Sequence, residues 1–162
     1  PFEDKSFDAA MAVLTVHHWS DQAKGLREMR RVTRGPVVLL TYDPSFRGFW
    51  LADYVPELVD LDERRMPRLA EYEACLGSVG ITDIPIPQDC TDGFLCAYRR
   101  RPFAYLDPEV RKAMSSFWLI GDVSDAMARL EAELNDGTWA ERYSDLEAQD
   151  ACDLGYRLVV SS

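Results

Sequence analysis

Two short apolar runs, separated by one amphipathic segment, constrain this chain more than any other feature of its sequence. Residues 7–14 (F-D-A-A-M-A-V-L) and 37–42 (V-V-L-L-T-Y) are almost unbroken in hydrophobicity, which is typical of strands buried on both faces of a parallel sheet. The segment between them has apolar residues at helical spacing, namely Ala23, Leu26, Met29 and Val32. Ser20 or Asp21 can cap its start, and Gly35-Pro36 ends it. A strand, a helix and a strand within about 35 residues predict a right-handed parallel crossover, and therefore an α/β fold.

Further along the chain, the pattern is mostly helical. Residues 43–65 carry several large rings and are interpreted as a helical insertion or lid. Pro67 suits the first turn of a helix, which is predicted to end where Gly80 can adopt a left-handed conformation. The apolar face of this helix consists of Leu69, Tyr72, Leu76 and Val79. Residues 81–86 then alternate as in a strand, and their proline is typical of a strand edge.

The last part of the chain combines helices with a final strand. Residues 92–101 indicate a helix or a short strand, and residues 105–117 indicate a helix. A clearer helix starts at Asp122 and ends before Gly137, with an apolar face made of Val123, Met127, Leu130 and Leu134. Residues 155–160 (G-Y-R-L-V-V) predict the last strand.

Length and composition indicate a single hydrophobic core. The chain has 162 residues, 47% of them hydrophobic, which is enough for one sizeable core and too little for two ordinary domains. We therefore expect one unit over residues 1–162, with helical insertions at 43–65 and 92–148. The aromatic residues of the second insertion are expected in the core, among them Phe117, Trp118 and Trp139.

The charge of the chain disfavours nucleic acid and anionic membranes as partners. Lys and Arg total 18 against 28 Asp and Glu, which gives a net charge of -10 that repels phosphate groups. A short basic run, Arg99 to Arg101, is interpreted as a solvated face or as a partner for carboxylates rather than a phosphate site.

The cysteines and the hydropathy pattern predict a cytoplasmic protein. The four cysteines form no C-x-x-C pair and are expected to be free thiols in a reducing compartment. No stretch approaches the roughly 18 apolar residues that span a bilayer, and the first residues do not resemble an export signal. The two histidines have no cysteine or carboxylate cluster at ligand spacing beside them, so we predict no metal site.

A set of residues over positions 1–42 resembles a known family pattern. That pattern reads L-P-F-x-D-x-S-F-D-x-V, a strand, L-H-H, a helix with R-E-x-x-R-V, and a glycine turn. The matching residues are Pro1-Phe2, Asp4, Ser6-Phe7-Asp8, Val16-His17-His18, Leu26-Arg27-Glu28-Met29, Arg31-Val32 and Gly35. On these residues the chain resembles the class I S-adenosylmethionine-dependent methyltransferases of the ubiquinone and menaquinone biosynthesis type (methyltransferase type 11). It departs from them at Arg34-Gly35-Pro36, where members usually have K-P-G-G, so the turn is altered.

The resemblance implies a fold and a cofactor. It implies the C-terminal part of a Rossmann-like α/β sheet, with the strands at 7–14, 37–42 and 81–86 as the fourth, fifth and sixth and an antiparallel seventh strand at the end. It implies S-adenosylmethionine as cofactor, held in part by Pro1, Phe2 and His17 and by the strand end at Ala12 and Val13. The glycine-rich loop and the two acidic residues that hold the cofactor in the family precede this region and do not occur in the chain. We therefore expect the chain alone to be incomplete and inactive.

His17 and His18 are the candidate catalytic residues. By the resemblance, His17 would face the reaction centre, where either histidine could remove a proton from the methyl acceptor near neutral pH. The alternative is that one histidine is packed and hydrogen-bonded while the other lies near solvent.

An aromatic cluster after the second strand is the candidate substrate pocket. Its members are Tyr42, Phe46, Phe49, Trp50 and Tyr54. Aromatic walls shape an apolar pocket, and they can also stabilise a sulfonium by cation–π attraction. The alternative is that these rings belong to the ordinary core.

Two functions remain open from the sequence. One is transfer of a methyl group from S-adenosylmethionine to a small acceptor. The other is a non-catalytic, self-associating assembly module, because the strand at 7–14 would leave an unpaired edge. We expect a homodimer or a missing N-terminal half to cover that edge at Ala10 and Ala12, together with an apolar face around Met11, Val13, Val37 and Leu39.

Overall fold

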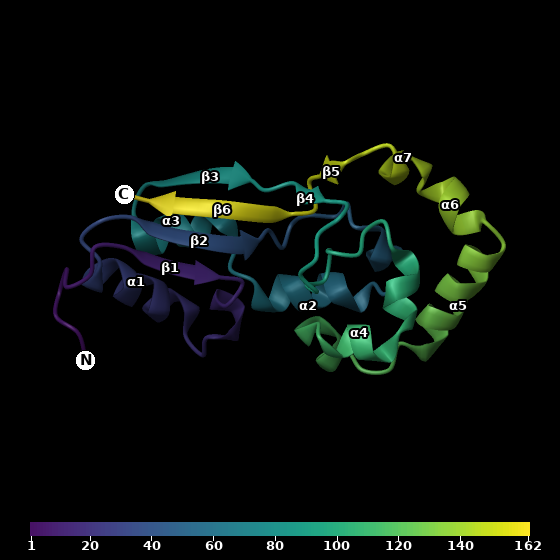
Figure 1. The fold of residues 1–162 in the computed structure, drawn as a ribbon. Coiled ribbons are helices and arrows are strands. Elements are labelled where there is room, and N and C mark those ends of the chain that lie inside the picture. The colour runs from purple at the N-terminus through teal and green to yellow at the C-terminus, as the bar shows by residue number, and fades with distance from the viewer. The chain divides into compact units, whose positions relative to one another are not determined.

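Four strands form a sheet in the order β1-β2-β6-β3 (Figure 1). Their bounds are Ala10–Val13 for β1, Val37–Tyr42 for β2, Val79–Asp83 for β3 and Tyr156–Ser161 for β6. β1 and β2 are parallel, whereas β6 is antiparallel to both β2 and β3. The predicted parallel crossover is therefore confirmed, and the last strand in sequence lies inside the sheet.

The chain forms two compact units in the computed structural model, which describes residues 1–162 except for the side chain of Glu147. The first unit comprises Pro1–Phe46, Glu63–Ile84 and Gly155–Ser162, and the second comprises Arg47–Asp62 and Pro85–Leu154. This differs from the single unit that composition predicts. The reason is that the segments interpreted as insertions carry enough aromatic residues to form a core of their own.

Two helices cover one face of the sheet in the first unit. They are α1 (Gln22–Val32) and α3 (Leu69–Leu76). α1 begins where the sequence predicts, since the carboxylate of Asp21 accepts a hydrogen bond from the backbone N–H of Lys24 at 2.9 Å. α3 ends earlier than predicted, at Gly77 with φ 83°, because this glycine already provides the left-handed turn.

The core of the first unit lies between these helices and the sheet. Alternate residues of β2 and β6 point toward the helices, and Val37, Leu39 and Val159 are fully buried there. They meet Leu26 of α1 and Tyr72 of α3, which are 1% and 0% exposed. Inward and outward residues alternate with a period of two, as expected for a strand that is covered on one face.

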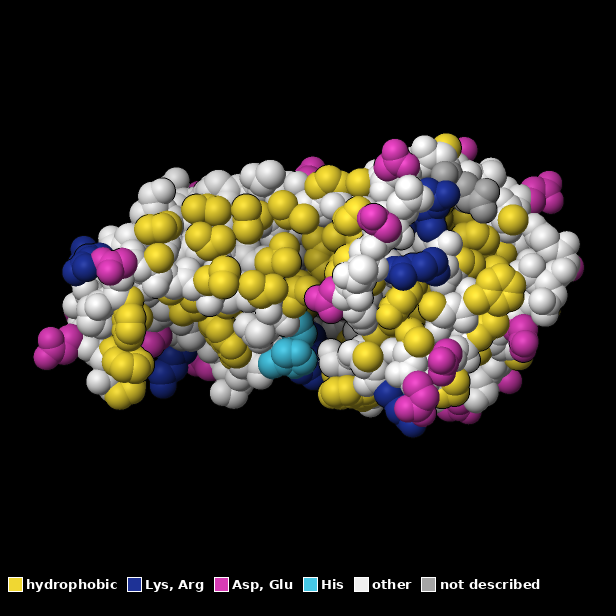
Figure 2. All heavy atoms as spheres, in the orientation of Figure 1, with side chains coloured by type: hydrophobic (Ala, Val, Ile, Leu, Met, Phe, Trp, Pro, Cys, Tyr) yellow, Lys and Arg dark blue, Asp and Glu magenta, His cyan; other side chains and the backbone are white. Residues whose placement is uncertain are grey.

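The other face of the sheet is apolar and exposed. Its side chains are those of Met11, Val13, Val38, Leu40, Leu158 and Val160, aligned by the strand register. Met11 and Val13 are 73% and 46% exposed. Figure 2 shows hydrophobic side chains spread over these strands. The expectation that Val37 and Leu39 belong to this face is wrong, because the register points them into the core.

The remaining elements are short and mostly helical. In the first unit η1 is Val16–His18. α2 (Glu57–Arg65) begins in the second unit and ends in the first. The second unit contains β4 (Ile86–Pro87), β5 (Ala151–Cys152), η2 (Trp50–Asp53), η3 (Pro102–Leu106), α4 (Pro108–Lys112), η4 (Ser115–Trp118), α5 (Ser124–Asn135), α6 (Thr138–Arg142) and α7 (Ser144–Glu147). None of these helices, in the residues described, is both long enough and apolar enough to cross a membrane.

Several predictions for the second unit need correction. Residues 92–101 form turns, neither a helix nor a strand, and the helix predicted at 105–117 is divided into short pieces. α5 agrees with its predicted pattern. Trp139 is buried as expected, whereas Trp118 is 68% exposed and donates from its indole N–H to the carbonyl of Lys112.

Arg99 ties the second unit together from inside. It is fully buried, not solvated, and its guanidinium donates to the carbonyls of Ile86, Leu146 and Gln149. Ile86 belongs to β4, and Leu146 and Gln149 lie in the segment that leads into β5. The basic run therefore contributes to structure, because carbonyl dipoles satisfy the charge that a carboxylate was expected to meet.

Gly35 keeps the altered turn before β2 compact. A Cβ atom at this position would lie 2.2 Å from the backbone carbonyl oxygen of Asp8. We expect Gly35→Ala to lower the free energy of unfolding by about 1–3 kcal/mol, because backbone, not a flexible side chain, must move. Chemical denaturation measures this change.

Gly80→Ala is the matched control. Gly80 lies in the same sheet, and a Cβ atom there would have its nearest neighbour, the carbonyl oxygen of Val160, at 4.0 Å. Equal destabilisation by both variants would show that the loss of glycine, not the contact with Asp8, is responsible.

Candidate active site

The carboxyl ends of β1 and β2 lie side by side, as the parallel pairing requires. In open α/β sheets, ligands bind outside the carboxyl ends of the strands. After β1 the chain turns at Leu14, which has φ 47°, an uncommon conformation for a non-glycine residue. The turn leads directly into η1, which carries His17 and His18.

His17 is half-buried, and His18 is exposed. The centroids of their rings are 4.0 Å apart. Burial, the charge of His18 and the charge of Arg65 together lower the pKa of His17 to about 4. His17 is therefore neutral at pH 7, and its ring can donate one hydrogen bond and accept one.

Arg65 is a neighbour of His17 that sequence reasoning missed. Its Nη2 donates to the backbone carbonyl of His17 at 3.2 Å, and its own carbonyl accepts from Nε2 of Gln22 at 2.7 Å. Its Nε is buried and has no hydrogen-bond partner among the described residues. Nothing in the local sequence indicates this contact, because Arg65 and His17 are brought together only by the fold.

The carboxyl end of β2 carries two rings of the predicted pocket. The rings of Tyr42 and Phe46 meet edge to face, with centroids 6.5 Å apart. Gly155 makes this packing possible. It has φ 86°, and a Cβ there would lie 2.8 Å from the Tyr42 ring and 2.9 Å from Phe46.

The structure places the other three predicted pocket residues in the second unit. Phe49, Trp50 and Tyr54 are 7%, 4% and 4% exposed. The indole N–H of Trp50 donates to the carbonyl of Arg99, and its ring contacts those of Tyr105 and Trp139. This is the arrangement of a core, which was the alternative interpretation of the cluster.

The predicted cofactor residues of β1 point to opposite faces of the sheet. Ala12 is buried toward the helices, and Val13 is half-exposed on the other face. Only the backbone of this strand end, together with Val13, is thus open to a ligand.

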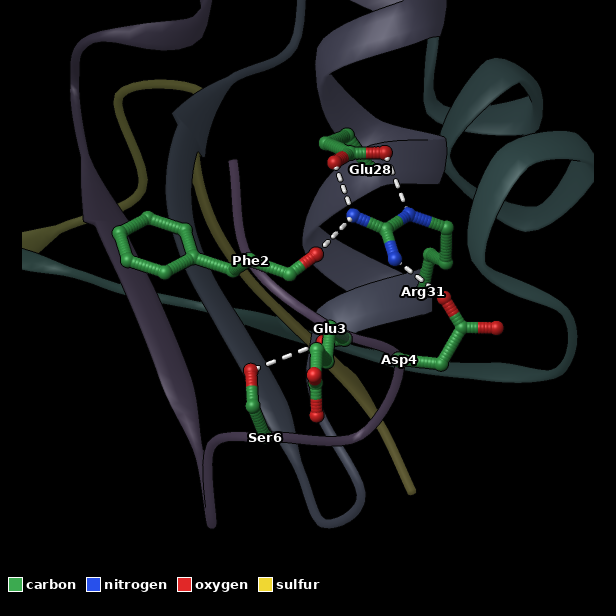
Figure 3. A network of polar contacts seen from close by, with 6 residues as sticks. All are labelled: Phe2, Glu3, Asp4, Ser6, Glu28 and Arg31. Atoms are coloured by element: carbon green, nitrogen blue, oxygen red, sulfur yellow. Dashed lines mark hydrogen bonds and ion pairs between the residues drawn. The ribbon is translucent and has the colours of Figure 1, made fainter.

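The first residues of the chain are fixed to α1 by Arg31. Figure 3 shows the guanidinium between three partners: it donates to the carbonyl of Phe2 at 2.8 Å, to Glu28 and to Asp4. Ser6 closes the segment by donating to the carbonyl of Glu3 at 2.9 Å. Glu28 and Arg31 are three residues apart on α1, so their side chains pair, and the paired guanidinium also binds the carbonyl of Phe2.

A shallow apolar recess of about 340 Å³ lies beside this segment. Pro1, Phe2, Trp19 and Met29 contribute to its lining. Trp19 lies over Gly25, where a Cβ would be 2.3 Å from the indole ring. The recess has a lining suited to a flat, apolar group.

Comparison with known proteins shows similarity to methyltransferases. Residues 1–40 match the family described as a methyltransferase domain. A protein from Anabaena variabilis, described as a methyltransferase from an antibiotic biosynthesis pathway, has 34% sequence identity and a TM-score of 0.90. The match covers 99% of this chain and 68% of the Anabaena chain.

Two other solved structures are more distant. Phosphoethanolamine N-methyltransferase 2 from Haemonchus contortus, in complex with S-adenosylhomocysteine, has 13% identity and a TM-score of 0.44. The YcgJ protein from Bacillus subtilis has 20% identity and a TM-score of 0.45. Each match covers 99% of this chain, but only 34% and 64% of the respective relatives.

The lowered pKa of His17 predicts a titration and a loss of stability in acid. An NMR titration of the two histidines is expected to give His17 a midpoint near pH 4, below the ordinary value of 6.5. His17 of the unfolded chain, with the ordinary pKa of 6.5, binds a proton more tightly than His17 of the folded chain. The free energy of unfolding therefore falls as the pH drops from about 6.5 to about 4.

His18→Asn provides the control. It removes one of the charges that lower the pKa of His17, so the midpoint is expected to rise. A midpoint of 6.5 for His17 in the unmodified chain would contradict the burial seen in the structure.

Proposed function

Because this chain belongs to the class I S-adenosylmethionine-dependent methyltransferases, we propose that it takes part in the transfer of a methyl group from S-adenosylmethionine to a small-molecule acceptor. The observation that carries this proposal is the similarity to the Anabaena protein along 99% of the chain. The position of the histidines at the carboxyl ends of parallel strands supports it, because that edge is where such sheets bind ligands.

Two parts of the first unit are assigned to parts of the cofactor. We assign the methionine part to the end of β1, near Val13 and His17, where Arg65 has a buried N–H without a partner among the described residues. We assign the adenosine part to the recess that Pro1 and Phe2 help to line. When bound, S-adenosylmethionine supplies a methyl group activated by a positively charged sulfur.

His17 is assigned to the acceptor. A ring with a pKa near 4 is a weak base at neutral pH, so full proton removal is not its best role. Its neutral nitrogen can accept a hydrogen bond from the acceptor and orient the attacking atom. Positioning is a large part of what a displacement at a methyl group requires. His18, exposed beside it, helps to keep His17 neutral.

Tyr42 and Phe46 are assigned to the wall of the acceptor site. Their edge-to-face packing at the end of β2 gives a rigid aromatic surface. Such a surface excludes water and also favours a positively charged group. Phe49, Trp50 and Tyr54 are assigned to the core of the second unit, with no contact to the acceptor.

The test is methyl transfer by the full-length protein, measured as release of S-adenosylhomocysteine with a panel of small nucleophiles. His17→Ala is expected to lower turnover by about tenfold or more, while the Kd for the cofactor changes by about twofold or less. The reason is that His17 is assigned to the acceptor, not to cofactor binding.

His18→Ala is the matched control and is expected to have the smaller effect on turnover. Loss of cofactor binding equal to the loss of turnover in His17→Ala would assign this histidine to structure or to the cofactor. Absence of any release of S-adenosylhomocysteine would contradict the proposed function itself.

One observation favours a second candidate, a self-associating assembly module. The apolar face that carries Met11, Val13, Val38 and Leu40 has no charged residue in the register of these strands, in a chain of net charge -10. Contact through this face places no like charges against each other, whereas contact between acidic surfaces does. We propose that a second copy covers this face in a two-fold symmetric dimer.

The edge strand adds to this proposal. The amides of Ala10 and Leu14 donate toward β2, so the backbone of Met11 and Val13 points to the open edge of β1. The expectation that Ala10 and Ala12 lie at the open edge is therefore wrong. Unpaired strand edges are a common route to association.

Light scattering across a dilution series tests the dimer. Val13→Asp is expected to give a monomer, because it places a charge on the proposed interface. Ile81→Asp is the matched control: Ile81 is 42% exposed against 46% for Val13, and it lies on the opposite edge strand, facing the other side of the sheet. An unmodified chain that is monomeric at all concentrations would contradict the dimer.

A further inference from the structure

The charge of Arg65 lacks the carboxylate partner that several other arginines of the chain have. Arg31, Arg34 and Arg157 each pair with a carboxylate. The buried Arg99 instead donates to three carbonyls. Arg65 is partly buried, forms no ion pair among the described residues, and donates to one carbonyl.

This arrangement is costly unless something completes it. A buried donor without a partner loses the hydrogen bond it made with water, and a charge withdrawn from solvent loses more. The Nε of Arg65 is such a donor. Acidic residues are common in this chain, which has 28 of them, yet none of the described ones forms an ion pair with Arg65.

The surroundings of Arg65 are suited to an anion. Its Nη2 is held by the backbone of His17, and that contact fixes the guanidinium beside η1. Its charge also helps to lower the pKa of His17, so the two groups disfavour each other's positive charge. An anion bound at the guanidinium of Arg65 would offset this positive charge and accept hydrogen bonds from it.

We propose that Arg65, oriented by the backbone carbonyl of His17, forms a binding subsite for a carboxylate at the carboxyl end of β1. A carboxylate matches the guanidinium in shape and charge, and its two oxygens can accept from neighbouring N–H groups of the guanidinium. Arg65 acts as a binding residue, and the carbonyl of His17 orients it. The proposal rests on the proposed function only for the identity of the molecule that carries the carboxylate.

Two molecules could supply it, the methionine part of the cofactor or the methyl acceptor. The chemistry is the same in both cases, and paired probes separate them. S-adenosylhomocysteine has the methionine carboxylate, and 5′-methylthioadenosine lacks it. Benzoate has a carboxylate, and benzyl alcohol lacks it.

The experiment follows the side-chain N–H of Arg65 by nitrogen-15 NMR in the chain of residues 1–162. A shift with S-adenosylhomocysteine but not with 5′-methylthioadenosine supports the cofactor as the source. A shift with benzoate but not with benzyl alcohol supports the acceptor. Failure of both carboxylate probes to shift this signal at saturating concentration overturns the proposal.

Variants give a second measurement. Arg65→Met is expected to weaken binding of the effective carboxylate probe by about tenfold or more, and Arg65→Lys, which keeps the charge, by less. Arg64→Met removes the same charge from the neighbouring, exposed position and is expected to leave the affinity unchanged. Equal weakening of probe binding by Arg64→Met and Arg65→Met would overturn the proposal, because the loss of affinity would then follow from the net charge of the chain and not from contact with Arg65.

The proposal and the proposed function can fail separately. A chain that binds benzoate through Arg65 while the full-length protein transfers no methyl group would retain the subsite and lose the function. Methyl transfer with an unchanged KM for both substrates in Arg65→Met would retain the function and lose the subsite. If Arg65→Met does not fold, the NMR result on the unmodified chain decides.

Discussion

The packing of alternate residues of β2 and β6 against two helices holds the first unit together, and the candidate site depends on it. Val37, Leu39 and Val159 have no exposed surface, and the helices contribute Leu26 and Tyr72 to the same core. This contact fixes β2, and the parallel pairing then fixes β1 beside it. The turn that carries the histidines can occupy only one place once both strands are set.

Sequence reasoning was most successful where the pattern is local. The bounds of β2 were predicted, and the cap was narrowed to Ser20 or Asp21, because an apolar run and a capping side chain act within a few residues. The last strand is antiparallel, as the family resemblance implies, and the structure places it beside β2. The α/β class is thus shown by pattern, resemblance and structure alike.

What the sequence could not provide depends on contacts between distant residues. The neighbour of His17 is Arg65, and the partners of the fully buried Arg99 are carbonyls that no residue type indicates. The aromatic residues after β2 look alike in the sequence, yet Phe46 packs at the strand end and Trp50 within the core of another unit. Composition also predicts one unit, because it measures total apolar content and not how that content is divided.

The place of β6 within the sheet has a consequence for how the molecule is made. Val37 pairs with Ser161, and Ile81 pairs with Val159, so the central strand is synthesised only after every residue of the second unit. Until then β2 and β3 lack the neighbour that joins them, and their hydrogen-bonding edges are open to other chains. Such distant pairings slow folding, since the loop that separates the strands must close first. During translation, therefore, the second unit can form its hydrophobic core before β6, which joins β2 to β3, has been synthesised.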